Sequence, residues 1–552
     1  MKTTTAAESN RRLNAAMWLG LAALCVLVTV QNWNYFRARP GYVGGTNCAD
    51  YLLQSVSVAY TLTGDPSQHF APGVLTRVSY KGPLFPLVGG VFGAIGGKSL
   101  PVYNLAATLF LLLAMVAVFD IGRRVGNAAL GLAAAALLAG LPTVAGQSLT
   151  HTPEIAQMAM VAWAVALLLR PGMNFAVAAG LLAGLAMLSR GTAFIYITAP
   201  VAWAVAVRWR QDDEGRKAAL SYLGLFTLGA LLVCGPWYLV RLEKLASDLS
   251  YHLFDFFNKY QAGHTETGRF FLAELWRANS LAVFVLFLVS LAGGLWKRLP
   301  GFAYFALWFA LPFIVFAIAP ADIARFMIPT YPAIALAIVA FVGSLRPRAL
   351  TAALLVVLVL FAFVGRLILL EQWQPESFQA RQKLMRVAPL AVEGQYWPHS
   401  PDAVAALARH APAEEPLWLG IIDYGEHEGS PPALVTVLWS FVRPLQGTIK
   451  LRQRIATPFD LKLFAQSLPS LDYVLVLATP KSGGWPGDSD LAVMIAQRGP
   501  LQERDYAIPT EESFEVIAAQ GKLMEELDRR SIRNAWGSPF DLVLWKRKEP
   551  GV

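Results

Sequence analysis

Apolar windows long enough to cross a hydrocarbon core of roughly 30 Å recur along the first two-thirds of this chain of 552 residues. They lie at 15–33, 101–121, 128–146, 153–169, 174–189, 193–208, 218–240, 280–296, 301–319, 327–344 and 350–370. So many apolar segments need a bilayer around them, because a water-soluble domain cannot bury them all. The windows therefore predict a polytopic α-helical membrane protein with about eleven transmembrane helices.

The composition agrees with a membrane protein. Hydrophobic residues make up 55% of the chain and charged residues only 15%, which is too little charge to cover a water-soluble protein of this length. The formal net charge is +9, but a basic excess on a membrane protein marks its cytoplasmic loops, so we do not expect a nucleic acid partner. The three cysteines, Cys25, Cys48 and Cys234, form neither a disulfide framework nor a CxxC metal motif.

The positions of the basic residues check the span assignment, because Lys and Arg collect in cytoplasmic loops. Basic clusters fall on every second connection: Arg11 and Arg12, Arg123 and Arg124, Arg170, the run 208–217, Lys297 and Arg298, and Arg346 and Arg348. An error of one span in the middle would scatter these clusters over both faces. We therefore expect a cytoplasmic N-terminus and an extracytoplasmic C-terminus.

The loops on the predicted extracytoplasmic face differ from the cytoplasmic loops, because they carry isolated acids and bases at the ends of spans. They are Asp50 and Lys81 in the first loop, His151 and Glu154 in a short turn, Arg190, the segment 241–279, and the turn 322–325. Any one of these residues alone is explained as an interfacial side chain that reaches the head groups. Charges at membrane depth are costly, however, so several that converge on one face indicate a functional site there.

The long first loop, 34–97, contains two stretches that stand out, 47–50 and 80–84. Apolar residues at helical spacing predict a helix over 49–63 that lies in the membrane interface. A second helix over 83–95 is too short to cross, and its glycines suit close packing. These helices would hold Asp50 and Lys81 at the membrane surface, at the depth of a polar head group carried on a lipid tail.

The segment 241–279 is aromatic and mixed in charge, with tyrosines and phenylalanines around Asn258 and Lys259. Two interpretations remain open. The segment is either another interfacial helix with an aromatic belt or a lid over a lipid-linked substrate.

Charge and proline content rise after residue 372, and no further window could span a bilayer. The pattern predicts strands at 417–424, 434–441, 473–479 and 540–546 and helices at 378–386, 403–410 and 513–528. We therefore expect a membrane domain over 1–371 and a soluble extracytoplasmic α/β domain over 372–552. The triplet Glu426-His427-Glu428 does not predict a metal site, because neighbouring residues do not share a face in a strand or a helix.

Five short motifs, taken in order, resemble the GT-C membrane glycosyltransferases, in particular the bacterial group of protein O-mannosyltransferases and lipid A aminoarabinose transferases. The motifs are Asp50 in the first external loop, Lys81-Gly82-Pro83-Leu84-Phe85, the run 184–191 ending in Ser189-Arg190-Gly191, Pro236-Trp237-Tyr238, and Ala324-Arg325-Phe326-Met327-Ile328-Pro329. The resemblance covers about residues 15–370 and implies a GT-C fold in a bacterial cytoplasmic (inner) membrane.

The sequence departs from the family pattern at three places. The acid of the first loop is single, Tyr80 stands where a glutamate commonly precedes the lysine, and Arg190 stands where the family has a lysine. The sequence therefore does not require the divalent metal that paired acids hold in some relatives, and it leaves metal dependence open. The resemblance does not identify the acceptor, which can be a glycan, a lipid or a protein.

The resemblance implies an inverting enzyme that moves a sugar from a polyprenyl-phosphate-linked donor to an acceptor on the outer face of the membrane. This reaction needs a base for the acceptor's proton and cations for the leaving phosphate. We predict Asp50 as the base and Lys81, Arg190 and Arg325 as phosphate ligands. Glu154, as the partner of Arg190, and Tyr80, Asn258 and Lys259 are the predicted supporting residues.

Two other functions fit a polytopic chain of this kind. A secondary transporter would place its charges near the bilayer midplane and would show an internal repeat, whereas here the charges lie at the outer ends of spans and we find no repeat. A non-catalytic assembly component of the cell envelope is the second alternative, and the sequence leaves it open.

Overall fold

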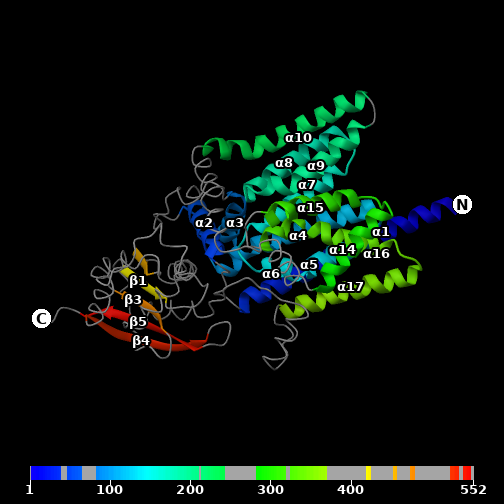
Figure 1. Ribbon diagram of the computed structural model, residues 1–552. Helices are drawn as coiled ribbons and strands as arrows, with labels where there is room; N and C mark the ends of the chain where they lie inside the picture. The colour runs from blue at the N-terminus through cyan, green and yellow to red at the C-terminus, as the bar shows by residue number, and fades with distance from the viewer. Residues whose placement is uncertain are drawn as a thin grey trace. The chain divides into compact units, whose positions relative to one another are not determined.

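The structure is a computed structural model of the whole chain (Figure 1). It describes residues 2–38, 46–64, 82–97, 99–210, 213–242, 281–318, 324–369, 418–423, 452–456, 473–478, 523–533 and 539–548. The chain divides into two compact units. Unit one comprises Met1–Tyr35, Leu75–Val88 and Asn104–Val392, and unit two comprises Phe36–Val74, Gly89–Tyr103 and Glu393–Val552. The predicted domain boundary at residue 372 lies outside the described residues and stays a prediction.

Unit one is a bundle of apolar helices (Figure 1). In chain order these are α1 (Lys2–Ala38), α4 (Leu100–Val125), α5 (Ala128–Gly140), α6 (Pro142–Gln147), α7 (Glu154–Leu168), α8 (Met173–Ser189), α9 (Ala193–Trp209), α10 (Asp213–Leu239), α14 (Leu281–Trp296), α15 (Phe302–Ile318), the 3₁₀ helix η3 (Ala324–Thr330), α16 (Tyr331–Gly343) and α17 (Arg348–Leu369). The first turn of α4 belongs to unit two.

The described residues of every predicted apolar window are mostly helical. Among the described residues, five helical segments are long and apolar enough to cross a membrane by themselves: Asn14–Arg37, Leu100–Val125, Glu214–Leu239, Phe326–Gly343 and Arg348–Leu367. The remaining apolar helices are shorter. The chain is therefore a mostly helical polytopic membrane protein, and the number eleven stays a prediction.

One window was predicted wrongly as a single helix. The stretch 128–146 contains two helices, α5 and α6, which are separated by Leu141 in an extended conformation with φ −60° and ψ 126°. A proline disfavours the helical conformation of the residue before it, and it is well suited to the first position of a new helix. Pro142 therefore ends α5 and starts α6.

Helices α8 and α10 approach each other closely. A Cβ atom at Gly180 would lie 2.1 Å from the carbonyl oxygen of Phe226, and one at Gly184 would lie 2.6 Å from that of Ala230. Two glycines four residues apart lie on one face of a helix and let the backbones meet. This packing fixes the helix whose C-terminal end carries Arg190.

Asp120 on α4 gathers three arginines at one end of unit one. It accepts hydrogen bonds from Arg123 Nη2 at 2.7 Å, from Arg124 Nε at 2.9 Å and from Arg170 Nη2 at 2.9 Å. Arg123 also lies over the ring of Trp18 on α1, 5.9 Å from its centroid. Two of the predicted cytoplasmic clusters therefore lie together, beside the N-terminal half of α1.

Two later basic segments lie at this same end. Gly301, which follows the basic residues 297–298, lies so close to Val125 at the end of α4 that a Cβ atom would be 2.9 Å from it. Arg208 is in the last turn of α9, the helix that begins beside Arg190 at the opposite end. We call this end of unit one the basic end and the other the Arg190 end. Which of them faces the cytoplasm stays a prediction.

The helical part of unit two is built around α2 (Thr46–Leu62). The second half of α3 (Leu84–Gly96) packs on it so closely that a Cβ atom at Gly90 would lie 2.4 Å from Val58 Cβ. The buried cluster here consists of Leu52, Val56, Ala59, Tyr60, Leu100 and Tyr103. The two helices predicted in the first loop are thus confirmed, while their position in the membrane interface stays a prediction.

Unit two also contains a five-stranded mixed sheet with the order β2-β1-β3-β5-β4 (Figure 1). The strands are β1 (Trp418–Asp423), β2 (Arg452–Ala456), β3 (Tyr473–Ala478), β4 (Met524–Arg533) and β5 (Pro539–Arg547). Strand β1 pairs in parallel with β2 and β3, with Leu419 opposite Tyr473, and β5 pairs antiparallel with β3 and β4.

The predicted strands at 417–424, 473–479 and 540–546 are confirmed as β1, β3 and β5. Strand β2 was not predicted, and the helix predicted over 513–528 is wrong from Met524 onward, where β4 begins. The register of β4 against β5 shifts between Glu526 and Asp528. This irregularity interrupts the alternation of side chains, so the sequence lacks a strand pattern there. The predictions at 378–386, 403–410 and 434–441 lie outside the described residues.

Candidate functional site

Arg190 and Glu154 form an ion pair at the Arg190 end of unit one. Helix α8 ends at Ser189, and Arg190 takes an extended conformation with φ −159° and ψ 133°. Its Nη1 donates to Oε1 of Glu154, the first residue of α7. The Glu154 side chain is 2% exposed and the Arg190 side chain 16% exposed. A carboxylate in the first turn of a helix is also stabilised by the helix dipole, which helps to hold this charge in place.

Residues of η3 complete one side of this pair. The guanidinium of Arg190 lies over the ring of Phe326, 4.4 Å from its centroid. Tyr196 on α9 donates its hydroxyl hydrogen to the carbonyl oxygen of Phe326. Arg325 directly precedes Phe326, so the backbone that carries this second predicted phosphate ligand lies beside the first.

The first-loop motif also lies near the pair. Gly82 approaches the backbone of α8 so closely that a Cβ atom would lie 1.9 Å from the carbonyl oxygen of Leu188, two residues before Arg190. Phe85 packs against His151 with ring centroids 4.7 Å apart, and His151 precedes Glu154 by three residues. The Gly82 contact places the chain next to Lys81 beside Arg190.

A third motif meets the same end of α8. Tyr238, at the end of α10, donates its hydroxyl hydrogen to the carbonyl oxygen of Met187 at 2.8 Å. Four of the five motifs that resemble the glycosyltransferases therefore converge around Ser189 and Arg190, although they come from four separate parts of the chain. Asp50, the fifth, belongs to unit two, and only its backbone is described, within α2.

His151 does not add a positive charge to the site. Its side chain is fully buried in the turn before α7. This burial lowers the pKa of His151 to about 3. The imidazole is therefore neutral at physiological pH, and the positive charge beside Glu154 comes from Arg190.

Several residues of this site were not predicted from the sequence. Gln157 Nε2 donates to the carbonyl oxygen of Arg190 at 3.3 Å and to Thr192 Oγ1 at 3.2 Å, which ties α7 to the start of α9. Tyr196 is another. Phe326 lies within the motif 324–329, but the sequence predicted no role for it. For Gln157, its polar character within an apolar helix was the only signal available, and Tyr196 carried none.

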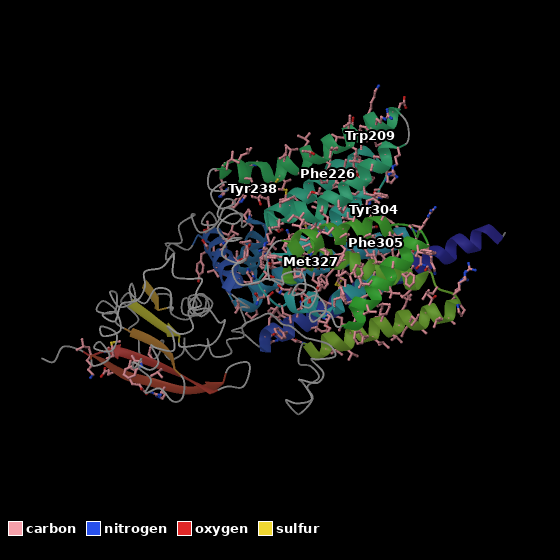
Figure 2. The ribbon with its side chains drawn as sticks, viewed as in Figure 1. Trp209, Phe226, Tyr238, Tyr304, Phe305 and Met327 are labelled. Atoms are coloured by element: carbon pink, nitrogen blue, oxygen red, sulfur yellow. The ribbon has the colours of Figure 1, made fainter. Side chains whose placement is uncertain are left out.

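An apolar cavity of about 610 Å³ lies between α8, α9 and α10. Met187 and Phe194 line it near Arg190, Phe226 lines its middle, and Trp209 and Arg210 line it at the basic end. Figure 2 labels Phe226 and Trp209 along these helices. From Phe194 to Trp209 helix α9 rises about 22 Å, so the cavity is an elongated groove beside Arg190.

The remaining predicted site residues are less fully described. Tyr80, Lys81, Asn258 and Lys259 lie outside the described residues, and Asp50 and Arg325 are described only by their backbone. Within the part of the chain that the structure describes, no group of three or more His, Cys, Asp or Glu residues is arranged to hold a metal ion.

Comparison with known proteins finds a family model that matches part of the chain. Residues 80–239 match the family model described as dolichyl-phosphate-mannose-protein mannosyltransferase. The matched region contains Lys81, Glu154, Arg190 and the motif 236–238. A comparison with curated protein sequences found no match.

Solved structures share the fold. The crystal structure of ArnT from Cupriavidus metallidurans bound to undecaprenyl phosphate matches with a TM-score of 0.57 at 14% sequence identity, over 95% of this chain and 98% of that chain. The chain has an ArnT-like GT-C fold. The apo state of ArnT matches with a TM-score of 0.56. The apo oligosaccharyltransferase of Archaeoglobus fulgidus matches with 0.51 at 12% identity, over 92% of this chain and 79% of that chain. The resemblance to the GT-C group that the motifs predicted is confirmed.

Proposed function

We propose that this protein is an inverting glycosyltransferase that uses a polyprenyl-phosphate-linked sugar as donor. The observation that carries the proposal is the convergence of Arg190, the backbone beside Lys81 and the backbone beside Arg325 next to an apolar groove that Met187 and Phe194 line. This arrangement combines cations for a phosphate with an apolar surface for a lipid tail. One structural relative, ArnT from Cupriavidus metallidurans, has undecaprenyl phosphate bound in its crystal structure, which supports a donor of this class.

The cations would bind the donor through its phosphate. Arginine binds phosphate through two parallel hydrogen bonds, whereas lysine acts as a point charge. A guanidinium carries five N–H groups, so Arg190 is able to bind Glu154 and a phosphate at the same time. We assign phosphate binding to Arg190, Lys81 and Arg325, and the orientation of Arg190 to Glu154.

The groove would hold the first isoprene units of the donor. Its lining is mostly alanine, valine and aromatic side chains. Two of the lining residues, Met187 and Phe194, are close to Arg190 in the sequence, one before it and one after it. A tail in the groove and a phosphate at Arg190 would orient the sugar away from the bilayer. Burial of the apolar tail supplies affinity that is independent of the sugar.

In the chemical step the acceptor's oxygen or nitrogen attacks the anomeric carbon of the sugar. The carboxylate of Asp50 takes the acceptor's proton, and the bond between the anomeric carbon and the phosphate oxygen breaks. The polyprenyl phosphate leaves with the bonding electron pair, and the cations stabilise the negative charge that develops on it. Direct displacement inverts the anomeric configuration. Asp50 is assigned this role because of its place in the first-loop motif.

The site would face the outside of a bacterial cytoplasmic membrane. The basic end of unit one carries the clustered arginines around Asp120, and the excess of Lys and Arg in cytoplasmic loops assigns this end to the cytoplasm. The Arg190 end is then the outer end.

The C-terminal part of the chain would select or dock the acceptor, because the candidate base and phosphate ligands all precede residue 372. Substitutions on the membrane-facing surface of this domain should change acceptor use and leave hydrolysis of the donor intact. An equal loss of transfer and donor hydrolysis would contradict this assignment.

The test is incubation of the purified protein with radiolabelled polyprenyl-phosphate sugars and an envelope extract as acceptor. Transfer that is lost in Arg190→Gln and retained in Arg170→Gln, a matched arginine at the basic end, supports the enzyme. Uptake of the sugar into proteoliposomes without transfer would support a transporter instead. The same assay with and without EDTA decides whether a divalent metal is required.

A further inference from the structure

Arg366 on α17 is a buried arginine inside the helix bundle, and its side chain is fully covered. Its Nε donates to Gln31 Oε1 at 3.0 Å, its Nη1 to the carbonyl oxygen of Ala139 at 2.9 Å, and its Nη2 to Asn32 Oδ1. These acceptors are two side-chain amides and one backbone carbonyl. A charge held at membrane depth by neutral acceptors is costly, which points to a specific task.

The hydrogen bond from Arg366 fixes the orientation of Asn32. A guanidinium only donates, so the Asn32 amide must present its oxygen to Arg366 and its nitrogen to the other side. On that side Asn32 Nδ2 lies 3.0 Å from Thr108 Oγ1 and 3.3 Å from Ser148 Oγ. Arg366 thereby determines which group of Asn32 meets Ser148.

Ser148 begins the turn that leads to the candidate site. Thr152 Oγ1 donates to Gln147 Oε1 at 2.9 Å, and Thr150 Oγ1 donates to the carbonyl oxygen of Gln147 at 3.0 Å. The side chains in this turn are buried. The turn ends at Glu154, which pairs with Arg190.

We propose that Arg366 is a positioning residue that acts through Asn32 and Ser148 to hold the 148–153 turn, and with it Glu154, in the arrangement that binds the donor phosphate. This inference rests on the proposed function. It assigns Arg366 no contact with the substrate. The residue would instead set the geometry of Glu154 and thereby that of Arg190.

Asn32→Asp tests the chain of hydrogen bonds with little change in shape. The aspartate still accepts from Arg366, but it has no N–H groups for Thr108 and Ser148. We expect faster hydrogen exchange of the amides of the 148–153 turn and about a tenfold loss of affinity for undecaprenyl phosphate, because a small displacement of a binding group is enough for this. The Michaelis constant for the donor should rise more than the turnover number falls.

Arg366→Gln should give the same two changes if it folds, and Arg170→Gln serves as the control. Arg170 is a partly buried arginine that bonds the carboxylate of Asp120 at the basic end, so its loss should lower stability without changing exchange in the turn or donor affinity. If Arg366→Gln does not fold, Asn32→Asp still tests the link through which Arg366 is proposed to act. Parent-like exchange in the turn and parent-like affinity in Asn32→Asp would overturn the proposal. If the parent fails to bind undecaprenyl phosphate, the proposed function fails, while hydrogen exchange still tests the link from Asn32 to the turn.

Discussion

Removing either partner of the Arg190–Glu154 pair should destabilise the protein more than removing both. Breaking a buried ion pair leaves an uncompensated charge and costs about 3–5 kcal/mol. Because the Arg190 side chain is 16% exposed, solvent reaches it and we expect the lower end of this range for Glu154→Gln. Arg190→Gln removes the guanidinium beside Glu154, which is only 2% exposed, so its cost should be higher. The double variant leaves two neutral amides and should lie within about 1–2 kcal/mol of the parent.

The assay is reversible unfolding in mixed micelles, with and without undecaprenyl phosphate. In Glu154→Gln the lipid phosphate replaces the missing anion, so a concentration of about 100 times its dissociation constant should restore about 2.7 kcal/mol. The double variant should unfold normally and gain little from the lipid, because the arginine is absent. If both single variants unfold like the parent, or if the lipid stabilises Arg190→Gln as much as the parent, the pair does not organise a phosphate site.

Four further predictions address other parts of the site and the topology. Gly82→Ala should cost about 1–3 kcal/mol in the same unfolding assay and weaken donor binding, because the new Cβ atom would meet a backbone carbonyl oxygen at 1.9 Å; a fully stable and active variant would contradict this close approach. Asp50→Asn should slow transfer by about 10²- to 10⁴-fold in single-turnover measurements and leave donor affinity nearly intact; transfer near the parent rate would refute Asp50 as the base. Lys81→Ala should weaken donor affinity and also slow turnover, since a phosphate ligand acts in both the ground and transition states; unchanged affinity would argue against this role. A single cysteine at Ser400 should react with a membrane-impermeant reagent in intact cells, and reaction only after the membrane is opened would reverse the predicted topology.

The position of Asp50 argues against a purely structural role as a helix cap. Helix α2 already includes Thr46, so Asp50 lies inside the helix rather than at the residue that caps it. Loss of activity in a stable Asp50→Asn variant is therefore hard to attribute to a lost cap.

Local sequence signals failed where packing or chain geometry decided the structure. Pro142 stands inside an apolar window, and hydropathy alone did not register that it separates α5 from α6. The residues of β4 are charged and interrupted by a register shift, so their pairing with β5 left no alternating pattern to find. Strand β2 is a short stretch with two arginines, so its sequence also gave no pattern from which the pairing with β1 could be predicted.

The sequence by itself determined the membrane class, the helical windows and the set of candidate charges, because hydrophobic length and the distribution of Lys and Arg are read residue by residue. The motifs identified Lys81, Arg190 and Arg325 as candidate residues, but no local pattern predicts which distant segments of the chain are in contact. Tertiary structure decided that the chain beside Lys81 lies against Leu188 and that Phe326 lies under Arg190. The pairing of Glu154 with Arg190, in contrast, was predicted from the sequence and is present in the structure. These contacts depend on close packing between helices far apart in sequence, and a single glycine or buried amide decides whether they form.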